Sequence, residues 1–292
     1  MADRSEFIPH SQAYWNTAAD KYERVFTGTA IGRMWRDSVW HWLDMAFHSE
    51  SRILELNCGT GIDAIHLARR GVLVLGCDIS PRMIELARDN ARMARLEHRI
   101  NFCVLPSEDL ALLNAHAFAG TVSVASFDGG FSNFSGLNCV DDLAAVRRNL
   151  ATHLRLGAPL LLCMLGRINL WGRLRHLIRG NFVDAFRSTA DIVAAQGSEL
   201  VKVKYPSCRE IEMLFAPEFE LRRWKGVGVA IPPAYMEGWV MRMPGLARIL
   251  NGIEGLIAGI PGLRALGACV LLEFERVPSL PEDGDANPAS LG

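Results

Sequence analysis

An apolar strand, a glycine-rich turn and the start of a helix follow one another in this chain and constrain its fold most. Residues 53–64 read I-L-E-L-N-C-G-T-G-I-D-A, and a second apolar run, 72–77, ends on Asp78. Gly59 and Gly61 carry no Cβ, so the backbone can bend tightly there and approach a ligand closely. The Asp78 carboxylate, at the end of a strand, is placed to accept both hydroxyls of a ribose. The pattern therefore predicts a nucleoside pocket.

Strand and helix patterns alternate from residue 53 onward. Apolar runs predict strands at 53–57, 72–77, 100–105, 127–133 and 159–165. Helical periodicity falls between them, at 62–70, 81–95 and 140–154. Ser80 followed by Pro81 is a typical helix start, because serine caps the first turn and proline suits the first helical position. Strands that alternate with helices predict a parallel sheet covered on both faces.

The rest of the chain departs from this alternation. Residues 11–48 are expected to form one or two helices, and 167–200 an arginine-rich helical insertion. The remaining predicted elements are a strand at 201–205, a helix at 209–215, a strand near 219–224, a Gly/Pro-rich stretch with helical pieces at 226–267, and a last strand at 269–277 that returns to the sheet. The tail 278–292 is rich in Pro, Ser, Asp and Gly and is expected to be disordered.

Composition excludes several classes of protein. Half of the 292 residues are hydrophobic, so a sizeable core can form, and the net charge of -1 gives the chain as a whole no attraction to nucleic acid or anionic lipid. The seven cysteines contain no C-x-x-C pair, which indicates reduced thiols in a cytoplasmic protein, without a zinc site or disulfide framework. The first residues lack signal-peptide architecture. The apolar stretch 244–272 is interrupted too often by charged residues and proline to form a transmembrane segment.

The glycine turn allows two interpretations. Residues 59–64 fit G-x-G-x-x-A, the fingerprint of dinucleotide binding. Asp63, however, lies in the first turn of the following helix, where its carboxylate would repel a pyrophosphate. None of the four tyrosines has a lysine four residues later, so the Tyr/Lys pair of short-chain reductases is absent. A nucleoside cofactor without phosphates is therefore the favoured interpretation.

Taken together, the motifs resemble those of class I S-adenosylmethionine-dependent methyltransferases. They are Glu55 before N-C-G-T-G, C-D-I-S-P-R-M at 77–83 and F-D-G-G-F-S-N-F at 127–134. The resemblance covers roughly residues 10–165, and E-L-N-C-G-T-G with F-D-G-x-F-S-N-F is a recurring subgroup variant in which Asn57 replaces a common glycine. It implies a Rossmann-like, doubly wound sheet that is mostly parallel with an antiparallel last strand. Residues 1–50 would be a helical cap over the cofactor, and 51–277 the methyltransferase domain with lid insertions at about 167–200 and 226–267.

The resemblance also implies a site for S-adenosyl-L-methionine, with S-adenosyl-L-homocysteine as the product. Asp78 would hold the ribose hydroxyls, while Ile79 and Met83 would pack on adenine and Ser107 and Glu108 would lie near its edge. The remaining implied cofactor residues surround the methionyl part or close over it: Tyr14, Tyr22, Glu55, Asn57, Cys58, Gly59, Gly61, Ser132, Asn133 and Phe134. No metal is implied.

The implied activity is methyl transfer to a hydrophobic or aromatic small molecule, because both insertions are rich in aliphatic residues, tryptophan and glycine. The alternative is an enzyme that binds the sulfonium without losing its methyl group and assists a decarboxylation, hydroxylation or cyclisation. General-base candidates are Tyr22, His176, Tyr205 and Tyr235, none of them marked by a motif. A nucleic-acid acceptor is not expected, since a basic stripe and an N-P-P-Y tetrapeptide are both missing.

Two further points stay open at the level of sequence. The arginines 173, 175 and 179 are interpreted as a solvated helix face, with an anionic substrate or a lipid headgroup as the alternatives. A homodimer is compatible with the sequence, but nothing in the sequence sets the oligomeric state, the acceptor or the methylated atom.

Overall fold

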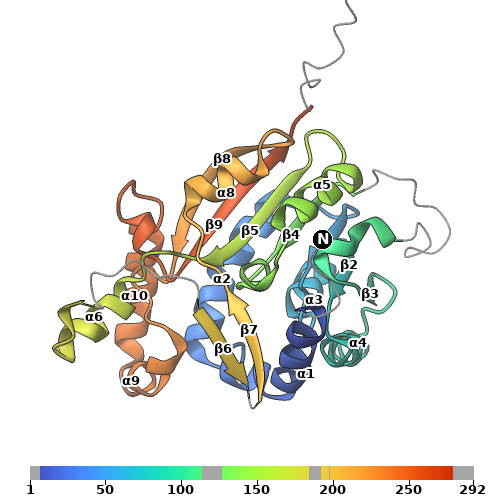
Figure 1. Cartoon of the computed structure of the whole chain (residues 1–292). Coiled ribbons are helices and arrows are strands. Elements are labelled where there is room, and N and C mark those ends of the chain that lie inside the picture. The colour runs from blue at the N-terminus through green and yellow to red at the C-terminus, as the bar shows by residue number, and fades with distance from the viewer. Residues whose placement is uncertain (1–6, 114–126, 184–191, 197, 279–292) are drawn as a thin grey trace, which may run out of the picture.

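A seven-stranded sheet forms the centre of the molecule (Figure 1). The computed structural model describes residues 7–113, 127–183, 192–196 and 198–278. The strands are β1 (Arg52–Leu56), β2 (Leu73–Asp78), β3 (Ile100–Val104), β4 (Gly129–Ser132), β5 (Pro159–Leu165), β8 (Phe219–Val227) and β9 (Cys269–Arg276). Their order is β3-β2-β1-β4-β5-β9-β8; β1 to β5 pair in parallel, while β9 runs antiparallel to both β5 and β8. The predicted mostly parallel sheet with an antiparallel last strand is confirmed.

Helices cover both faces of this sheet. The α-helices are α1 (Phe7–Val25), α2 (Ala30–Ala46), α3 (Ile62–Arg69), α4 (Pro81–Met93), α5 (Leu143–His153), α6 (Leu170–Ile178), α8 (Cys208–Phe215), α9 (Glu237–Arg242) and α10 (Pro244–Ile257). Short 3-10 helices are η1 (Ser107–Leu112), η3 (Gly136–Cys139), η4 (Ala234–Met236) and η5 (Arg264–Leu266). The predicted start of α4 is confirmed, because the Ser80 side chain accepts from the Met83 N–H and Pro81 opens the helix.

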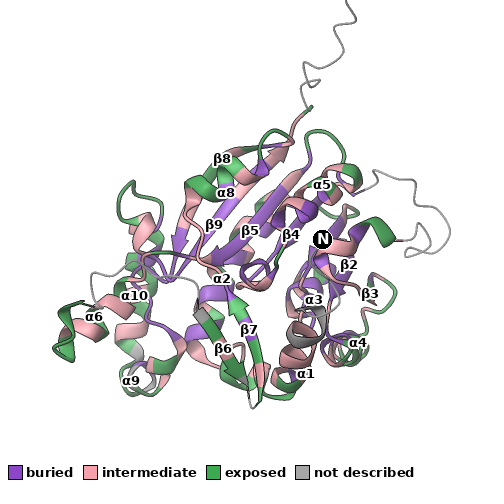
Figure 2. Cartoon of the chain, in the orientation of Figure 1, coloured by how far each residue is buried: buried purple, intermediate pink, exposed green. Residues whose placement is uncertain are grey.

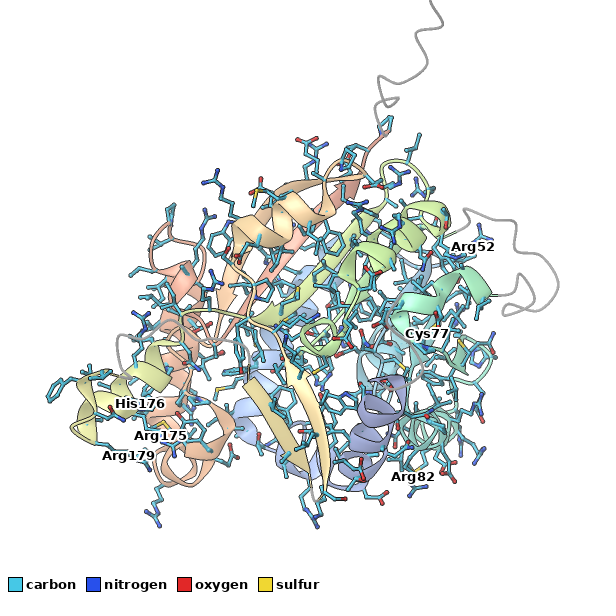
Figure 3. All side chains as sticks on the ribbon, viewed as in Figure 1. Arg52, Cys77, Arg82, Arg175, His176 and Arg179 are labelled. Atoms are coloured by element: carbon cyan, nitrogen blue, oxygen red, sulfur yellow. The ribbon has the colours of Figure 1, made fainter. Side chains whose placement is uncertain are left out.

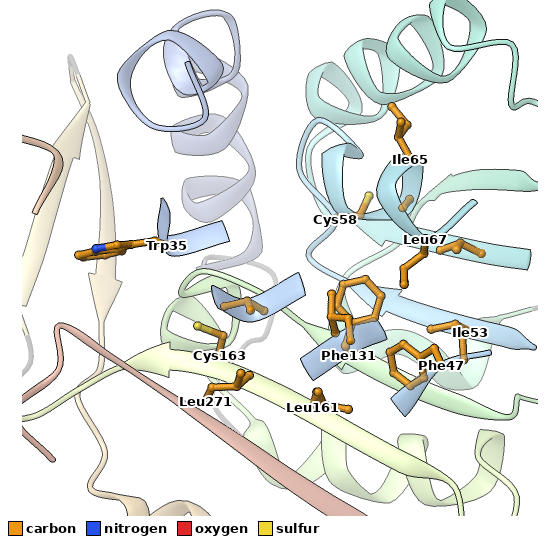
Figure 4. Packing of buried hydrophobic residues seen from close by; sticks show 14 of the residues in the cluster. Trp35, Phe47, Ile53, Cys58, Ile65, Leu67, Phe131, Leu161, Cys163 and Leu271 are labelled. Atoms are coloured by element: carbon orange, nitrogen blue, oxygen red, sulfur yellow. The ribbon is translucent and has the colours of Figure 1, made fainter. Parts of the chain in front are cut away.

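Two hydrophobic clusters lie on opposite faces of the sheet. Side chains alternate between the faces along a strand, so Ile53 joins the cluster with α2, α3 and α4, and Leu54 the cluster with α5 and α8. Figure 4 shows part of the first cluster, where Phe47 packs beside Phe131 with ring centroids 5.9 Å apart. Figure 2 shows the buried sheet strands between helices whose outer sides are exposed.

One region differs from the prediction for residues 167–200. Helix α6 ends at Ile178, and β6 (Ile192–Gln196) pairs antiparallel with β7 (Glu199–Val203) in a separate two-stranded sheet. The helical character expected for 167–200 therefore holds at 170–178 and is wrong at 192–196 and 199–200, while 184–191 and 197 lie outside the described residues. The strand predicted at 201–205 overlaps β7 of this hairpin. The hairpin packs against α1, as Figure 1 shows. Tertiary packing of this kind decides between helix and strand where local preference is weak.

Some expectations fall outside the described residues, namely most of the tail 278–292 and the first six residues. Among the described helices, none combines the length and the apolar character that crossing a bilayer requires.

Candidate cofactor site and acceptor cavity

The loop after β1 bends sharply at three residues with positive φ. Asn57, Gly59 and Gly61 have φ of 53°, 52° and 74°, a region that glycine enters freely and asparagine more readily than most residues. The Cys58 N–H donates to the Cys77 carbonyl, which ties the loop to the end of β2. The loop therefore turns directly across the carboxyl ends of β1 and β2.

Asp78, the last residue of β2, faces this loop. One carboxylate oxygen accepts from the Gly59 N–H and the other from the Ser80 N–H, both at 2.9 Å. Burial raises the pKa of this carboxyl to about 6, although both amide hydrogen bonds act in the opposite direction. A carboxylate has about four acceptor positions, so two remain for the hydroxyls of a ligand.

A crevice opens between this loop and α1. It consists of two hollows that share Trp15, Asn57, Ile79 and Gly136. The predicted cofactor residues that line it are Tyr22, Asn57, Gly59, Asp78, Ile79, Met83, Ser107, Glu108, Asn133 and Phe134. Residues from β1, β2, β4, α1 and η1, far apart in the sequence, thus meet at one edge of the sheet.

The other predicted cofactor residues do not line the crevice: they are Tyr14, Glu55, Cys58, Gly61 and Ser132. A Cβ on Gly61 would come within 2.6 Å of the Phe102 ring, so this glycine is required by packing behind the loop. Glu55 is buried behind the turn, where burial first and Asp63 second raise its carboxyl pKa well above the usual range. Glu55 and Gly61 therefore support the loop from behind.

The Asn57 side chain is held in the crevice by its neighbours. Its Oδ1 accepts from the hydroxyls of Ser107 and Ser132, each at 3.2 Å. A Cβ on Gly136 would lie 2.3 Å from the Asn57 Cβ, so a glycine is needed at that position. Asn57 thus projects a fixed amide at the position where the resemblance to methyltransferases leads one to expect glycine.

Seven residues that line the crevice were not predicted from the sequence: Ser11, Trp15, Pro106, Gly136, Cys139, Val140 and Asp141. Trp15 lines both hollows, and its ring centroid is 6.4 Å from that of Tyr22. A spacing of seven residues places Trp15 and Tyr22 on the same helix face. Tyr14 is about a quarter turn around the helix from both of them. That spacing was a usable signal.

Helix α1 is joined to the start of α4 by polar contacts. Gln12 donates to the Ile79 carbonyl at 3.0 Å, and the Ser80 hydroxyl donates to Asn16 at 2.6 Å. Arg82 pairs with Asp20 at 2.8 Å near the other end of the contact. These bonds hold α1 over the crevice.

The surroundings of Asp63 differ from those expected from the sequence. Its carboxylate is buried and accepts from Arg36 at 2.5 Å, from the Trp40 indole at 2.6 Å and from Asn133 at 2.9 Å. The Arg36 guanidinium also lies 5.0 Å from the centre of the Phe134 ring. Because Arg36 neutralises this carboxylate, Asp63 does not by itself exclude a ligand with phosphates. The expectation that Asp63 would repel a pyrophosphate is therefore not supported.

A second cavity, of about 320 Å³, lies beyond Phe26. Its lining residues are Trp35, Leu165, Gly166, Asn169, Gly172, Arg173, His176, Tyr205, Pro233 and Ala268. The Phe26 ring centroid is 4.8 Å from that of Phe134, which lines the crevice, and 6.2 Å from that of Trp35, which lines the cavity. Phe26 therefore stands between the two spaces.

The cavity wall is fixed by two carboxylates, a buried one in α10 and a partly buried one in α9. Both oxygens of Glu254 in α10 accept from the four backbone N–H groups of residues 228–231, at 2.7 to 3.2 Å. Glu237 in α9 accepts from the N–H groups of Ala30 and Ile31, at the start of α2. The loop that leads to Pro233 is thereby tied to α10, and α9 to α2.

The four general-base candidates lie in three different places. Tyr22 lines the crevice, and desolvation raises its pKa to about 12. His176 and Tyr205 line the cavity, and burial also raises the pKa of Tyr205. Tyr235 is 58% exposed, with the Arg175 guanidinium 5.0 Å from its ring centre. In the described residues no group of three or more His, Cys, Asp or Glu side chains could hold a metal ion.

A known protein family matches the segment that lines the crevice, apart from the residues of α1. Residues 53–157 match the family described as a methyltransferase domain. A 23S rRNA (uracil(1939)-C(5))-methyltransferase of Shewanella amazonensis is 38% identical over 71 residues, which are 24% of this chain and 16% of that protein. The magnesium-protoporphyrin O-methyltransferase of Rhodobacter capsulatus is 39% identical over 61 residues, 21% of this chain and 27% of that protein. The chain thus spans less than a third of the length of either relative.

The fold extends the likeness to nearly the whole chain. The structure of geranyl diphosphate C-methyltransferase from Streptomyces coelicolor, in complex with S-adenosyl-L-homocysteine, is similar with a TM-score of 0.60. The identity is 14%, and the alignment covers 95% of this chain and 100% of that one. The chain thus contains a segment, 53–157, that matches a methyltransferase domain, and it has the fold seen in geranyl diphosphate C-methyltransferase.

Proposed function

We propose that this protein transfers the methyl group of S-adenosyl-L-methionine to a hydrophobic or aromatic small molecule. The observation that carries the proposal is the cavity of about 320 Å³ beside the crevice, with the Phe26 ring between Phe134 of the crevice and Trp35 of the cavity. Its volume falls in the range of sites that enclose small ligands, about 300–1,000 Å³. Trp35, Leu165, Pro233 and Ala268 give it an apolar wall.

In this proposal the cofactor occupies the crevice along its length. Adenine lies in the hollow of Ile79, Ser107 and Glu108, and the ribose hydroxyls donate to Asp78. The methionyl part passes Asn57 and Gly59, which brings the sulfonium end toward Phe134. Aromatic faces attract a cation, so Tyr22 and Phe134 favour the positively charged donor over the neutral product.

The chemistry then depends mainly on alignment. The donor carries an activated methyl group, and holding the acceptor in line with the carbon–sulfur bond supplies about 7–11 kcal/mol in favourable cases. Tyr22, with a pKa of about 12, remains a phenol near neutral pH and can donate a hydrogen bond but not remove a proton. If the acceptor must lose a proton, His176 in the cavity wall is the better placed group, since histidine is the commonest general base.

The relatives leave the acceptor open, because the chain spans less than a third of the length of either of them. One of them is named for an rRNA uracil and the other for magnesium protoporphyrin. The cavity and the net charge of -1 support a small molecule over RNA here, since RNA-binding surfaces are strongly positive.

Mass spectrometry with a donor that carries a deuterated methyl group tests the proposal. We expect the labelled methyl group on one apolar metabolite, with an equal amount of S-adenosyl-L-homocysteine. Trp35→Gln should reduce the labelling while donor affinity stays, because Trp35 lines the cavity and not the crevice. A transformed acceptor without S-adenosyl-L-homocysteine would instead support the non-methylating alternative, and labelling of RNA alone would contradict the small-molecule acceptor.

A further inference from the structure

Exposed apolar side chains gather on α6 and α10 and the residues that follow each. More than half of the large exposed apolar side chains in the described residues belong to 170–183 and 242–263. On α6 they are Leu170, Leu174 and Ile178, spaced four residues apart on one face. On and after α10 the members are Ile249, Ile253, Leu256, Ile260 and Leu263. We call the exposed side chains of 170–183 and 242–263 the lid face.

The exposed charges of the lid face are all positive. Residues 170–183 contain three arginines and no acidic residue. Residues 242–263 contain two arginines and one acid, Glu254, which is buried among backbone N–H groups. The whole chain has a net charge of -1, so this concentration of arginine is local.

The two parts of the lid face lie on the same side of the molecule. Figure 1 shows α6, α9 and α10 together, and the Arg175 guanidinium is 5.0 Å from the ring centre of Tyr235 in η4, directly before α9. Figure 3 places Arg175, His176 and Arg179 at this outer edge. Gly172 and Arg173 of the same helix line the cavity, so the lid face and the cavity wall are two sides of α6.

We propose that the lid face docks on an anionic lipid surface. Interfacial helices combine an apolar face that enters the acyl boundary with arginine or lysine that contacts anionic headgroups, and both features occur here. A second copy of this chain would bring arginines against arginines, which opposes a symmetric contact. Nucleic acid would satisfy the arginines but leave the aliphatic side chains without an apolar partner.

Docking would place the wall of the cavity at the membrane surface. An apolar molecule dissolved in the bilayer could then reach the cavity past α6 without crossing water. The proposal concerns the surface alone and does not depend on methyl transfer, because lipid binding can be measured without donor or acceptor.

Cosedimentation of the full chain with vesicles tests the proposal. We expect binding to vesicles with one third phosphatidylglycerol to exceed binding to pure phosphatidylcholine at least about tenfold, and to weaken as salt is raised. Ile178→Asp and Leu256→Asp should each reduce binding severalfold, since these side chains are 77% and 78% exposed. Met93→Asp is the matched control, because Met93 is 76% exposed on α4, away from the lid face, and should leave binding unchanged.

The same variants separate this proposal from its competitors. The double variant Arg179→Glu, Arg248→Glu should lose the preference for phosphatidylglycerol. It should stay folded, because both side chains are exposed. No binding to either vesicle, or equal binding by the wild type and Ile178→Asp, would overturn the proposal. Concentration-dependent dimers in analytical ultracentrifugation that Ile178→Asp abolishes would also overturn it, and would assign the lid face to a second copy.

Discussion

Binding of S-adenosyl-L-methionine should weaken when the pH is lowered through about 6. In the proposed site the ribose hydroxyls donate to an ionised Asp78, and burial raises the pKa of this carboxyl to about 6. Folding stability changes with pH in the other direction. Protonated Asp78 stabilises the folded protein fully below the unfolded pKa of about 4, and this stabilisation is lost as the pH rises through about 6. Donor binding and folding therefore favour different protonation states of one group.

The size of the effect follows from the fraction ionised. With a pKa of about 6, about nine-tenths of Asp78 is ionised at pH 7 and about one-tenth at pH 5, so the Kd should rise about tenfold. Asp78→Asn removes a charged acceptor and turns an N–H donor toward the N–H of Gly59 or Ser80. A hydrogen bond to a charged group is worth about 1.5–3 kcal/mol, so the Kd of this variant should rise about 10- to 150-fold near neutral pH.

Isothermal titration calorimetry with the donor and with S-adenosyl-L-homocysteine measures both effects. Asp89→Asn is the matched control, because this carboxylate is on α4, half-exposed and paired with Arg92. Glu108→Gln is needed as well, since burial also raises the pKa of Glu108 at the adenine end. Constant affinity of the wild type between about pH 5 and pH 8, or an Asp78→Asn variant that keeps the wild-type pH dependence, would refute the reasoning.

Three other substitutions test the surroundings of the site. Arg36→Met leaves the buried Asp63 carboxylate without its cation, and urea unfolding should show a loss of about 3–5 kcal/mol, which Arg36→Met with Asp63→Leu partly restores. Glu254→Gln turns an amide donor toward the N–H groups of residues 228–231; we expect a loss of about 1–3 kcal/mol and faster limited proteolysis in α10, and unchanged cleavage would count against the anchor. Phe26→Ala removes the ring between crevice and cavity, so single-turnover methyl transfer should slow about tenfold or more while the donor Kd changes little, and an equal loss of donor affinity would contradict a separating role.

The central sheet could be predicted from the sequence because its strands have local signals. The strands β1, β2, β3 and β5 each coincide with an apolar run bounded by turn residues, and their observed bounds differ from the predicted ones by one residue or less. The hairpin of β6 and β7 has no such signal. Its first strand contains two alanines, which favour a helix, and its packing on α1 brings together segments far apart in the chain.

Much of the candidate site could be predicted for the same reason. Asn57, Gly59 and Asp78 lie in consecutive motifs at the ends of strands, and the topology brings such positions together. The sequence could not show that Arg36 neutralises Asp63, because the pair depends on how α2 packs on α3. The cavity was equally out of reach, since its wall combines residues from α2, β5, α6 and the start of β9.

The position of Phe26 has a consequence for how this chain can diversify. The Phe26 ring lies between the crevice and the cavity, and none of the described lining residues belongs to both. Substitutions along α6 or around Pro233 can therefore reshape the cavity while the residues that line the crevice stay the same. If the proposed function is correct, acceptor specificity can evolve through substitutions in the cavity while the residues that bind the methyl donor stay unchanged.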